Sequence, residues 1–186
     1  MWIKRQDPYS LSVGMTGVKL GDRVLQIGCA HGGRLAAIAA KVGLSGRAVV
    51  VVSDQASAER AQKGAANAGV LVEVEMGEGT RLTADAASFD LAIVDDAGGA
   101  FSAMRVEDRV ATMREFARVV RPGGRAMIIG SAPREGLAAL LSRGQPTPSL
   151  AASGAASAAL EADGFRGVRT LAAREGLVFV EGIKPR

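Results

Sequence analysis

A short glycine-rich segment, GCAHGG at residues 28–33, holds the residue types best suited to binding a cofactor. It directly follows the apolar run VLQI, and a strand that turns through glycines into a helix brings its backbone close to a bound ligand. The pattern GxAxGG lacks the spacing of the GxGxxG dinucleotide fingerprint. The segment therefore favours an adenosine ligand other than a dinucleotide, with a tight turn that binds nothing as the alternative.

A carboxylate follows the second apolar run of the chain. Asp54, in Ser53-Asp54-Gln55, comes roughly 20 residues after the glycines, where an acidic residue can accept hydrogen bonds from both ribose hydroxyls. An aspartate at the end of a strand is also a common N-cap of the helix that follows. We favour the ribose role because the glycine-rich segment precedes it.

Two residues of the glycine-rich segment could take part in chemistry beyond backbone contacts. His31 is the only histidine and could act as a base near neutral pH, with a solvent-facing loop side chain as the alternative. Cys29 is the only cysteine. Because no base stands beside it in the sequence, we interpret Cys29 as a small packing residue rather than a nucleophile.

Length and composition predict one domain over residues 1–186, since 48% hydrophobic residues can form a core without metals or disulfides. A single cysteine allows no intramolecular disulfide, and the start MWIKRQDPYS lacks the apolar run of a secretory signal, so we expect a cytoplasmic protein. No apolar stretch approaches the roughly 18 residues of a membrane span. The net charge of +4 comes without a basic run. We therefore expect neither a membrane nor a nucleic acid as a partner.

Short apolar runs rich in β-branched residues alternate with helical patterns along the chain. The runs cover 24–27, 48–52, 70–74, 91–94 and 126–129, and the helical patterns cover about 33–43, 56–68 and 104–120. Such an alternation predicts an α/β fold with a Rossmann-like, doubly wound and mostly parallel sheet. Gly43 and Gly69 are placed to end the first two helices, and RPGG at 121–124 predicts a turn.

The chain changes character after the fifth run. Residues 144–156 are rich in Gly, Pro, Ser and Ala with little periodicity, so we expect a flexible excursion, either a lid or a slack loop. Two β-type runs then flank Arg174-Glu175-Gly176, which predicts a hairpin. The sheet is thus expected to end in an antiparallel hairpin, with residues 1–20 as an N-terminal segment of the same domain.

Four motifs in order make the chain resemble the class I S-adenosylmethionine-dependent methyltransferases. They are VLQIGCAHGG, VVVVSDQASAERAQKGAANAG, GEGTRLTADAASFDLAIV and EFARVVRPGGRAMIIG, and the resemblance covers about residues 18–130 and extends to the final hairpin. It implies a seven-stranded sheet whose last strand is antiparallel. It also implies S-adenosylmethionine as the cofactor and S-adenosylhomocysteine as its product.

The resemblance assigns the cofactor-binding residues position by position. Gly28, Ala30 and Gly32, with Cys29 between them, would lie under the methionine part of the cofactor, and Gln26 stands at the position of the family's first-strand acid.

The other assignments follow the later strands. Asp54 would bind the ribose hydroxyls, and Gln55 would lie against the adenine. Glu78, followed by Gly79, stands where the family has an acid for the adenine amino group, and Asp95 follows the fourth strand, where the sulfonium and methyl group lie.

Methyl transfer from a sulfonium is a direct displacement, so the protein mainly supplies alignment, exclusion of water and at most one base. Asp95 and Asp96 are the first candidates for that base, and His31 is the second. The (N/D)PPY motif typical of amino methylation of bases is absent after the fourth strand, so we expect a small-molecule acceptor.

Two departures from the family pattern keep other functions open. Gln26 replaces the first-strand acid and cannot offset a positive charge, and Ala30 replaces the middle glycine of the loop. A protein that binds the cofactor without catalysis is therefore one alternative, and an NAD(P)-binding oxidoreductase, motivated by the architecture alone, is another. A metal-dependent transferase would use Asp95 and Asp96 as oxygen ligands, but the sequence offers no third ligand and we predict no metal site.

Overall fold

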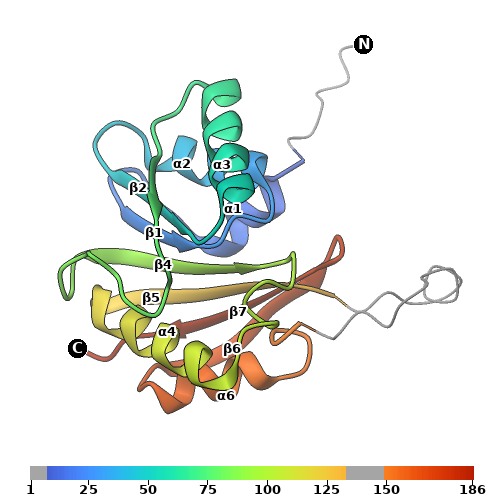
Figure 1. Cartoon of the computed structure of the whole chain (residues 1–186). Coiled ribbons are helices and arrows are strands. Elements are labelled where there is room, and N and C mark those ends of the chain that lie inside the picture. Colours follow the sequence, from blue (N-terminus) through green and yellow to red (C-terminus); the bar gives the residue numbers. More distant parts are fainter. Residues whose placement is uncertain (1–7, 133–148) are drawn as a thin grey trace, which may run out of the picture.

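The computed structural model describes residues 8–132 and 149–186 (Figure 1). Its elements, in chain order, are α1 (Ser10–Thr16), β1 (Arg23–Ile27), α2 (Gly32–Val42), β2 (Arg47–Val52), α3 (Gln55–Ala68), β3 (Glu73–Met76), β4 (Phe89–Asp96), α4 (Val106–Val119), β5 (Val120–Ser131), α6 (Ala155–Ala162), β6 (Arg166–Arg174) and β7 (Leu177–Ile183).

Seven strands form one sheet in the order β3-β2-β1-β4-β5-β7-β6. The pairs among β1 to β5 are parallel, and β7 is antiparallel to both of its neighbours, β5 and β6. The predicted doubly wound sheet with an antiparallel C-terminal hairpin is therefore confirmed. Successive connections run in opposite directions from β1 and from β4, and ligands of such sheets bind at the carboxyl ends of the strands at this switch point.

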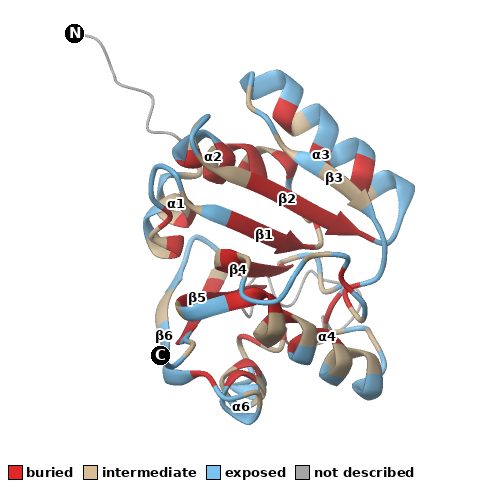
Figure 2. Ribbon diagram, turned by 90° about the vertical axis from the view of Figure 1, so that its left-hand side faces the viewer, coloured by how far each residue is buried: buried red, intermediate tan, exposed pale blue. Residues whose placement is uncertain are grey.

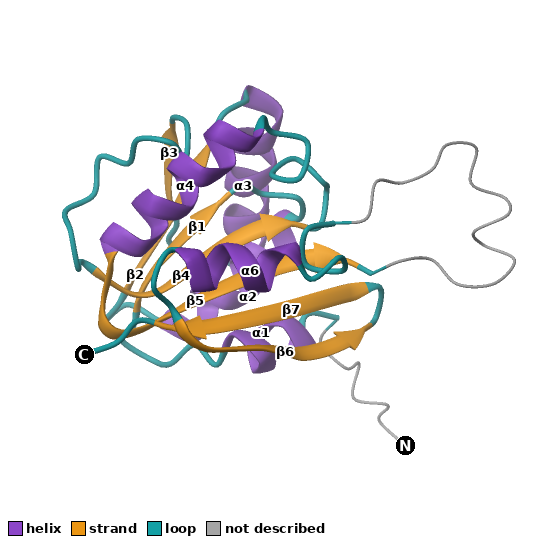
Figure 3. Cartoon of the chain, turned by 90° about the horizontal axis from the view of Figure 1, so that it is seen from below, coloured by secondary structure: helices purple, strands orange, loops and turns teal. Residues whose placement is uncertain are grey.

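Helices cover both faces of the sheet (Figures 1 and 2). The helices α1, α2 and α3 lie on one face, and α4 and α6 lie together on the other (Figure 3). In β1, Leu25 and Ile27 belong to the apolar cluster that contains Phe116 of α4, whereas Val24 packs with Ile38 of α2. Because successive side chains of a strand point to opposite faces, a strand covered on both faces is apolar throughout. No helix in the described ranges is long and apolar enough to cross a membrane.

The third strand lies later than the apolar run predicted. Gly69, with φ +64°, ends α3, and the Val70 amide still donates to the carbonyl of Ala65. Residues directly after the glycine therefore close the helix instead of starting the strand. As an edge strand with β2 as its partner, β3 pairs only from Glu73 to Met76.

The RPGG segment is not the simple turn that was predicted. The helix α4 ends at Val119 and β5 begins at Val120, so the segment lies inside β5. It forms an irregularity in the pairing with β4, between Phe89 and Leu91. Gly123 there has φ +73°, a conformation that favours glycine.

The described part of the predicted excursion, residues 149–156, is anchored. Ser149 is buried and its hydroxyl donates to the carbonyl of Ser131 at 2.7 Å, while the Leu150 amide donates to Ser102 Oγ at 3.0 Å. Ala156 is also buried and begins the packed side of α6. The rest of the predicted excursion, 144–148, lies outside the described residues.

Candidate functional site

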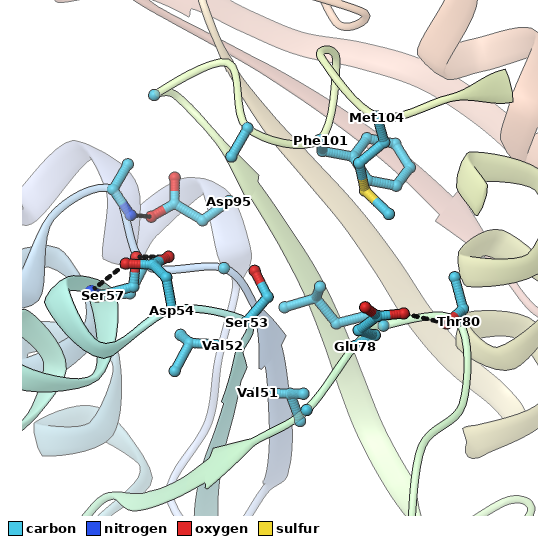
Figure 4. Close-up of a pocket in the computed structure, with 18 of the residues that line it drawn as sticks. Val51, Val52, Ser53, Asp54, Ser57, Glu78, Thr80, Asp95, Phe101 and Met104 are labelled. Atoms are coloured by element: carbon cyan, nitrogen blue, oxygen red, sulfur yellow. Dashed lines mark hydrogen bonds between the residues drawn. The ribbon is translucent and has the colours of Figure 1, made fainter.

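A cavity of about 580 Å³ lies at the carboxyl ends of β1, β2 and β4, at the switch point of the sheet (Figure 4). Its lining comes from the loops after β1, β2 and β3, from the start of α3 and from the loop between β4 and α4. Figure 4 shows Asp54 and Asp95 toward one end, and Glu78, Phe101 and Met104 toward the other. Its volume is in the range of roughly 300–1,000 Å³ that is usual for small-molecule sites.

The glycine-rich loop passes close to β4, and both the space and the backbone conformation at its first position favour glycine. Gly28 has φ +80°, and a Cβ on it would lie 3.0 Å from the carbonyl oxygen of Asp95. The Gly28 amide donates to the carbonyl of Val51 at 2.9 Å, and the Ala30 amide donates to Asp95 Oδ2 at 3.0 Å. The loop is therefore tied to both neighbouring strands, with its backbone against the cavity.

A buried ion pair supports the loop from behind. Arg34, in the first turn of α2, donates from Nη2 to Asp95 Oδ1 at 2.8 Å, and the two side chains are only 8% and 1% exposed. Arg34 Nε has no hydrogen-bond partner among the described residues. The charge of Asp95 is thus offset inside the protein, and both of its oxygens are engaged, Oδ1 by Arg34 and Oδ2 by Ala30.

Asp54 lies where both sequence interpretations need it. It lines the cavity at the end of β2 and it is the N-cap of α3. Oδ1 accepts from the Ser57 amide at 2.8 Å and Oδ2 accepts from the Ser57 hydroxyl at 2.7 Å. These hydrogen bonds, the one from the hydroxyl first, hold the pKa of Asp54 below its ordinary value. The helix cap is confirmed, and the ribose contact stays a prediction.

The far end of the cavity is apolar with acidic groups at its edge. Phe101 and Met104, both in the loop before α4, line it together with Glu78 and Asp108. Thr80 Oγ1 contacts Glu78 Oε2 at 3.4 Å.

Gly79 brings the loop after β3 close to the core beneath this end of the cavity. A Cβ on Gly79 would lie 2.9 Å from Thr112 Cγ2 and 3.1 Å from Ile27 Cγ2. A side chain at this position would therefore push the loop away from α4.

Sequence patterns did not single out several residues that line or support the site. Phe101, Met104 and Asp108 lie on or beside an irregular loop. Arg34 and Arg60 lie within helices, where the apolar periodicity does not predict which polar side chains reach the site. The spacing of Arg60, six residues after Asp54 on a helix that begins at the cavity, was the one signal that could have found it.

Five of the predicted site residues are not among those that line the cavity: Gln26, His31, Gly32, Gln55 and Asp96. The side chain of Gln26 points to the α2 side of β1 and its amide donates to the carbonyl of Gly28 at 2.8 Å, so it braces the loop. Gly32 lies where α2 crosses α3, and a Cβ there would overlap the carbonyl of Arg60. Gln26 and Gly32 therefore help to fix the position of the glycine-rich loop's backbone and do not line the cavity themselves.

The three others have partners of their own. Gln55 is exposed and donates to Glu59 at 3.1 Å. Asp96 is fully buried and accepts from the amide of Ser102 at 2.9 Å and from its hydroxyl, which holds the loop before α4. The ring of His31 is hydrogen-bonded through Nδ1 to the hydroxyl of Tyr9 at 3.2 Å.

Cys29 lines the cavity, but its thiol is poorly suited to act as a nucleophile. Burial, together with the negative charge of Asp95, raises its pKa to about 11. The thiolate is the reactive form, so the packing role expected from the sequence is consistent with this environment. No group of three or more His, Cys, Asp or Glu side chains among residues 8–132 and 149–186 is arranged to hold a metal ion.

Comparison with known proteins identifies the class of this chain. Residues 24–124 match the methyltransferase domain family, and the chain belongs to that family. A 37.1 kDa uncharacterized protein in transposon TN4556 from Streptomyces fradiae is 33% identical over 108 residues, which is 58% of this chain and 30% of that protein. The chain therefore spans less than a third of the length of this relative.

Solved methyltransferase structures share the fold. A SAM-dependent methyltransferase from Aquifex aeolicus is 19% identical and aligns over 95% of this chain and 89% of its own, with a TM-score of 0.73. A SAM-dependent O-methyltransferase from Thermotoga maritima is 16% identical and aligns over 99% and 69%, with a TM-score of 0.69. At this identity the similarity establishes the α/β methyltransferase fold.

Proposed function

We propose that the chain binds S-adenosylmethionine in the cavity and transfers its methyl group to a small-molecule acceptor. The observation that carries this proposal is the meeting of the glycine-rich loop and the Asp54 carboxylate in one cavity at the switch point between β1 and β4. Membership of the methyltransferase domain family supports it. When bound, S-adenosylmethionine supplies a methyl group on a positively charged sulfur that is already activated for displacement.

The residues of the cavity fit this group. An ionised carboxylate has about four acceptor positions, so Asp54 can cap α3 and still accept from ribose hydroxyls. Phe101 and Met104 offer an apolar surface for the adenine, with Glu78 as an acceptor for its amino group. The missing Cβ of Gly28 lets the loop lie against Asp95 of β4, with the loop backbone at the cavity where we place the methionine part.

The contacts of Asp95, Asp96 and His31 bear on their predicted role as bases. Asp95 lines the cavity but is engaged by Arg34 and Ala30, and Asp96 is engaged by Ser102 away from the cavity lining. We therefore assign Asp95 and Asp96 to positioning the two loops. A base role for His31 stays a prediction. Catalysis then rests on alignment of the acceptor and exclusion of water.

Calorimetric titration of the purified protein with S-adenosylmethionine, S-adenosylhomocysteine and NADH tests the proposal. We expect the first two to bind with dissociation constants in the micromolar range, about −8 kcal/mol, and NADH to give no heat. Binding of NADH alone would favour an oxidoreductase. The absence of both heat and thermal stabilisation at millimolar S-adenosylmethionine would reject the cofactor assignment.

A further inference from the structure

The cavity has an uneven distribution of charge. Four acidic residues line it, Asp54, Glu78, Asp95 and Asp108, but in the described part of the chain Arg60 is the only Lys or Arg that does so. Two of the acids are already paired with arginines from outside the lining, Asp95 with Arg34 and Asp108 with Arg105, each at 2.8 Å. Arg60, whose charge also helps to lower the pKa of Asp54, is therefore the one positive charge among the described lining residues that can meet an anionic group of a ligand.

Arg60 is held at the glycine-loop end of the cavity. It lies in α3, and its Nη1 donates to the carbonyl of Cys29 at 2.5 Å and contacts Ser57 Oγ at 3.4 Å. A guanidinium has five N–H donors in a rigid fork. Its Nε and Nη2 make no hydrogen bond to the described residues, so this edge of the fork remains for a ligand.

Two of the loop's own amides are not available to an anion at this end. The amide of Gly28 donates to Val51, and the amide of Ala30 donates to Asp95. Two donors that a glycine-rich loop could offer to a ligand are thus used within the protein. An anionic group beside the loop would find its counter-charge, together with charged N–H donors, in Arg60.

We infer that Arg60 is a specificity-determining residue that binds the carboxylate of the amino-acid part of the cofactor. This inference rests on the proposed function, because it places the methionine part at the glycine-rich loop. Arginine suits a carboxylate because its planar fork can donate two parallel hydrogen bonds. Arg60 thereby distinguishes adenosyl compounds that carry a carboxylate from those that do not.

The test compares two ligands that differ in the amino-acid part. S-adenosylhomocysteine carries the carboxylate, and 5′-methylthioadenosine lacks the whole amino-acid part. Dissociation constants of both are measured by calorimetry for the wild type, Arg60→Met, Arg60→Lys and the control Lys63→Met, which changes an exposed lysine on the same helix outside the cavity lining. Circular dichroism and thermal melting confirm that each variant is folded, and Arg60→Gln replaces the methionine variant if that one is not.

We expect Arg60→Met to weaken S-adenosylhomocysteine binding about 10- to 100-fold and 5′-methylthioadenosine binding by less than about twofold, since hydrogen bonds to charged groups are the strong ones. Arg60→Lys should recover part of the loss, and Lys63→Met should change neither ligand. Equal losses for both ligands would show that Arg60 only holds the loop through Cys29, and no loss would place the carboxylate elsewhere; either overturns the inference. If the wild type bound neither ligand, the proposed function itself would fall, and the inference with it.

Discussion

Removal of either member of the Arg34–Asp95 pair should cost far more stability than a surface ion pair. The side chains are 8% and 1% exposed, so Asp95→Asn leaves a buried guanidinium without a counter-charge, and Arg34→Met leaves a buried carboxylate. Breaking a buried pair in this way typically costs about 3–5 kcal/mol, a large part of a total stability of roughly 5–15 kcal/mol. For a chain of this size the melting temperature should fall by about 6–20 °C.

The double variant Arg34→Met/Asp95→Asn separates the pair from its surroundings. The double variant leaves no unpaired charge, so its loss of unfolding free energy should be smaller than the sum of the losses in the two single variants by at least about 1 kcal/mol. Urea unfolding at neutral pH, followed by circular dichroism, gives the three free energies of unfolding. Additive losses, or single losses below about 1 kcal/mol, would refute the conclusion that the two charges depend on each other.

Three further predictions follow from the described contacts. Asp54→Asn keeps a good N-cap, so it should melt close to the wild type but bind S-adenosylhomocysteine about tenfold or more weakly. Asp54→Ala should lose both thermal stability and affinity. Unchanged affinity in both variants would show that Asp54 serves only as the helix cap. Gly64→Ala would push a Cβ against the backbone of Gly32 and should lower the free energy of unfolding in urea by about 1–3 kcal/mol. Gly14→Ala, where the space is open, should be neutral or stabilising. Equal effects of the two substitutions would refute close packing between α2 and α3. Burial raises the pKa of Asp163 above its ordinary 3.8, so the charged form of Asp163 destabilises the folded protein. Asp163→Asn should therefore be more stable than the wild type at pH 7, and the difference in the free energy of unfolding should close as the pH falls through this pKa to below about 3.8. A stability difference that does not depend on pH would contradict the assignment.

The fold was predictable because its strands are buried on both faces. Runs such as 48–52 cannot alternate when helices cover both sides of the sheet, so they are recognisable without a structure. The edge strand β3 has one strand partner and exposed ends, and its position was predicted wrongly by about three residues. The RPGG segment was misread because an irregularity within a strand contains the same residues as a turn.

The site was predictable where it directly follows a strand. Gly28, Asp54 and Glu78 come one or two residues after β1, β2 and β3. Asp95, predicted to follow the fourth strand, is instead the last residue but one of β4. Parallel strands bring their carboxyl ends to one edge. A position just after a strand does not predict a site residue when the side chain turns away from the cavity, as that of Gln55 does. Residues that reach the cavity from helices or irregular loops have no such position in the sequence.

A crystal structure of the protein with S-adenosylhomocysteine tests the central claim most directly. We expect the nucleoside in the cavity between the glycine-rich loop and the loop before α4, with both ribose hydroxyls donating to Asp54 and the adenine beside Phe101 and Met104. We also expect the Asp54 contacts to Ser57 to persist, because the carboxylate can serve both. A ligand bound elsewhere, or in the cavity without contact to Asp54, would contradict the account.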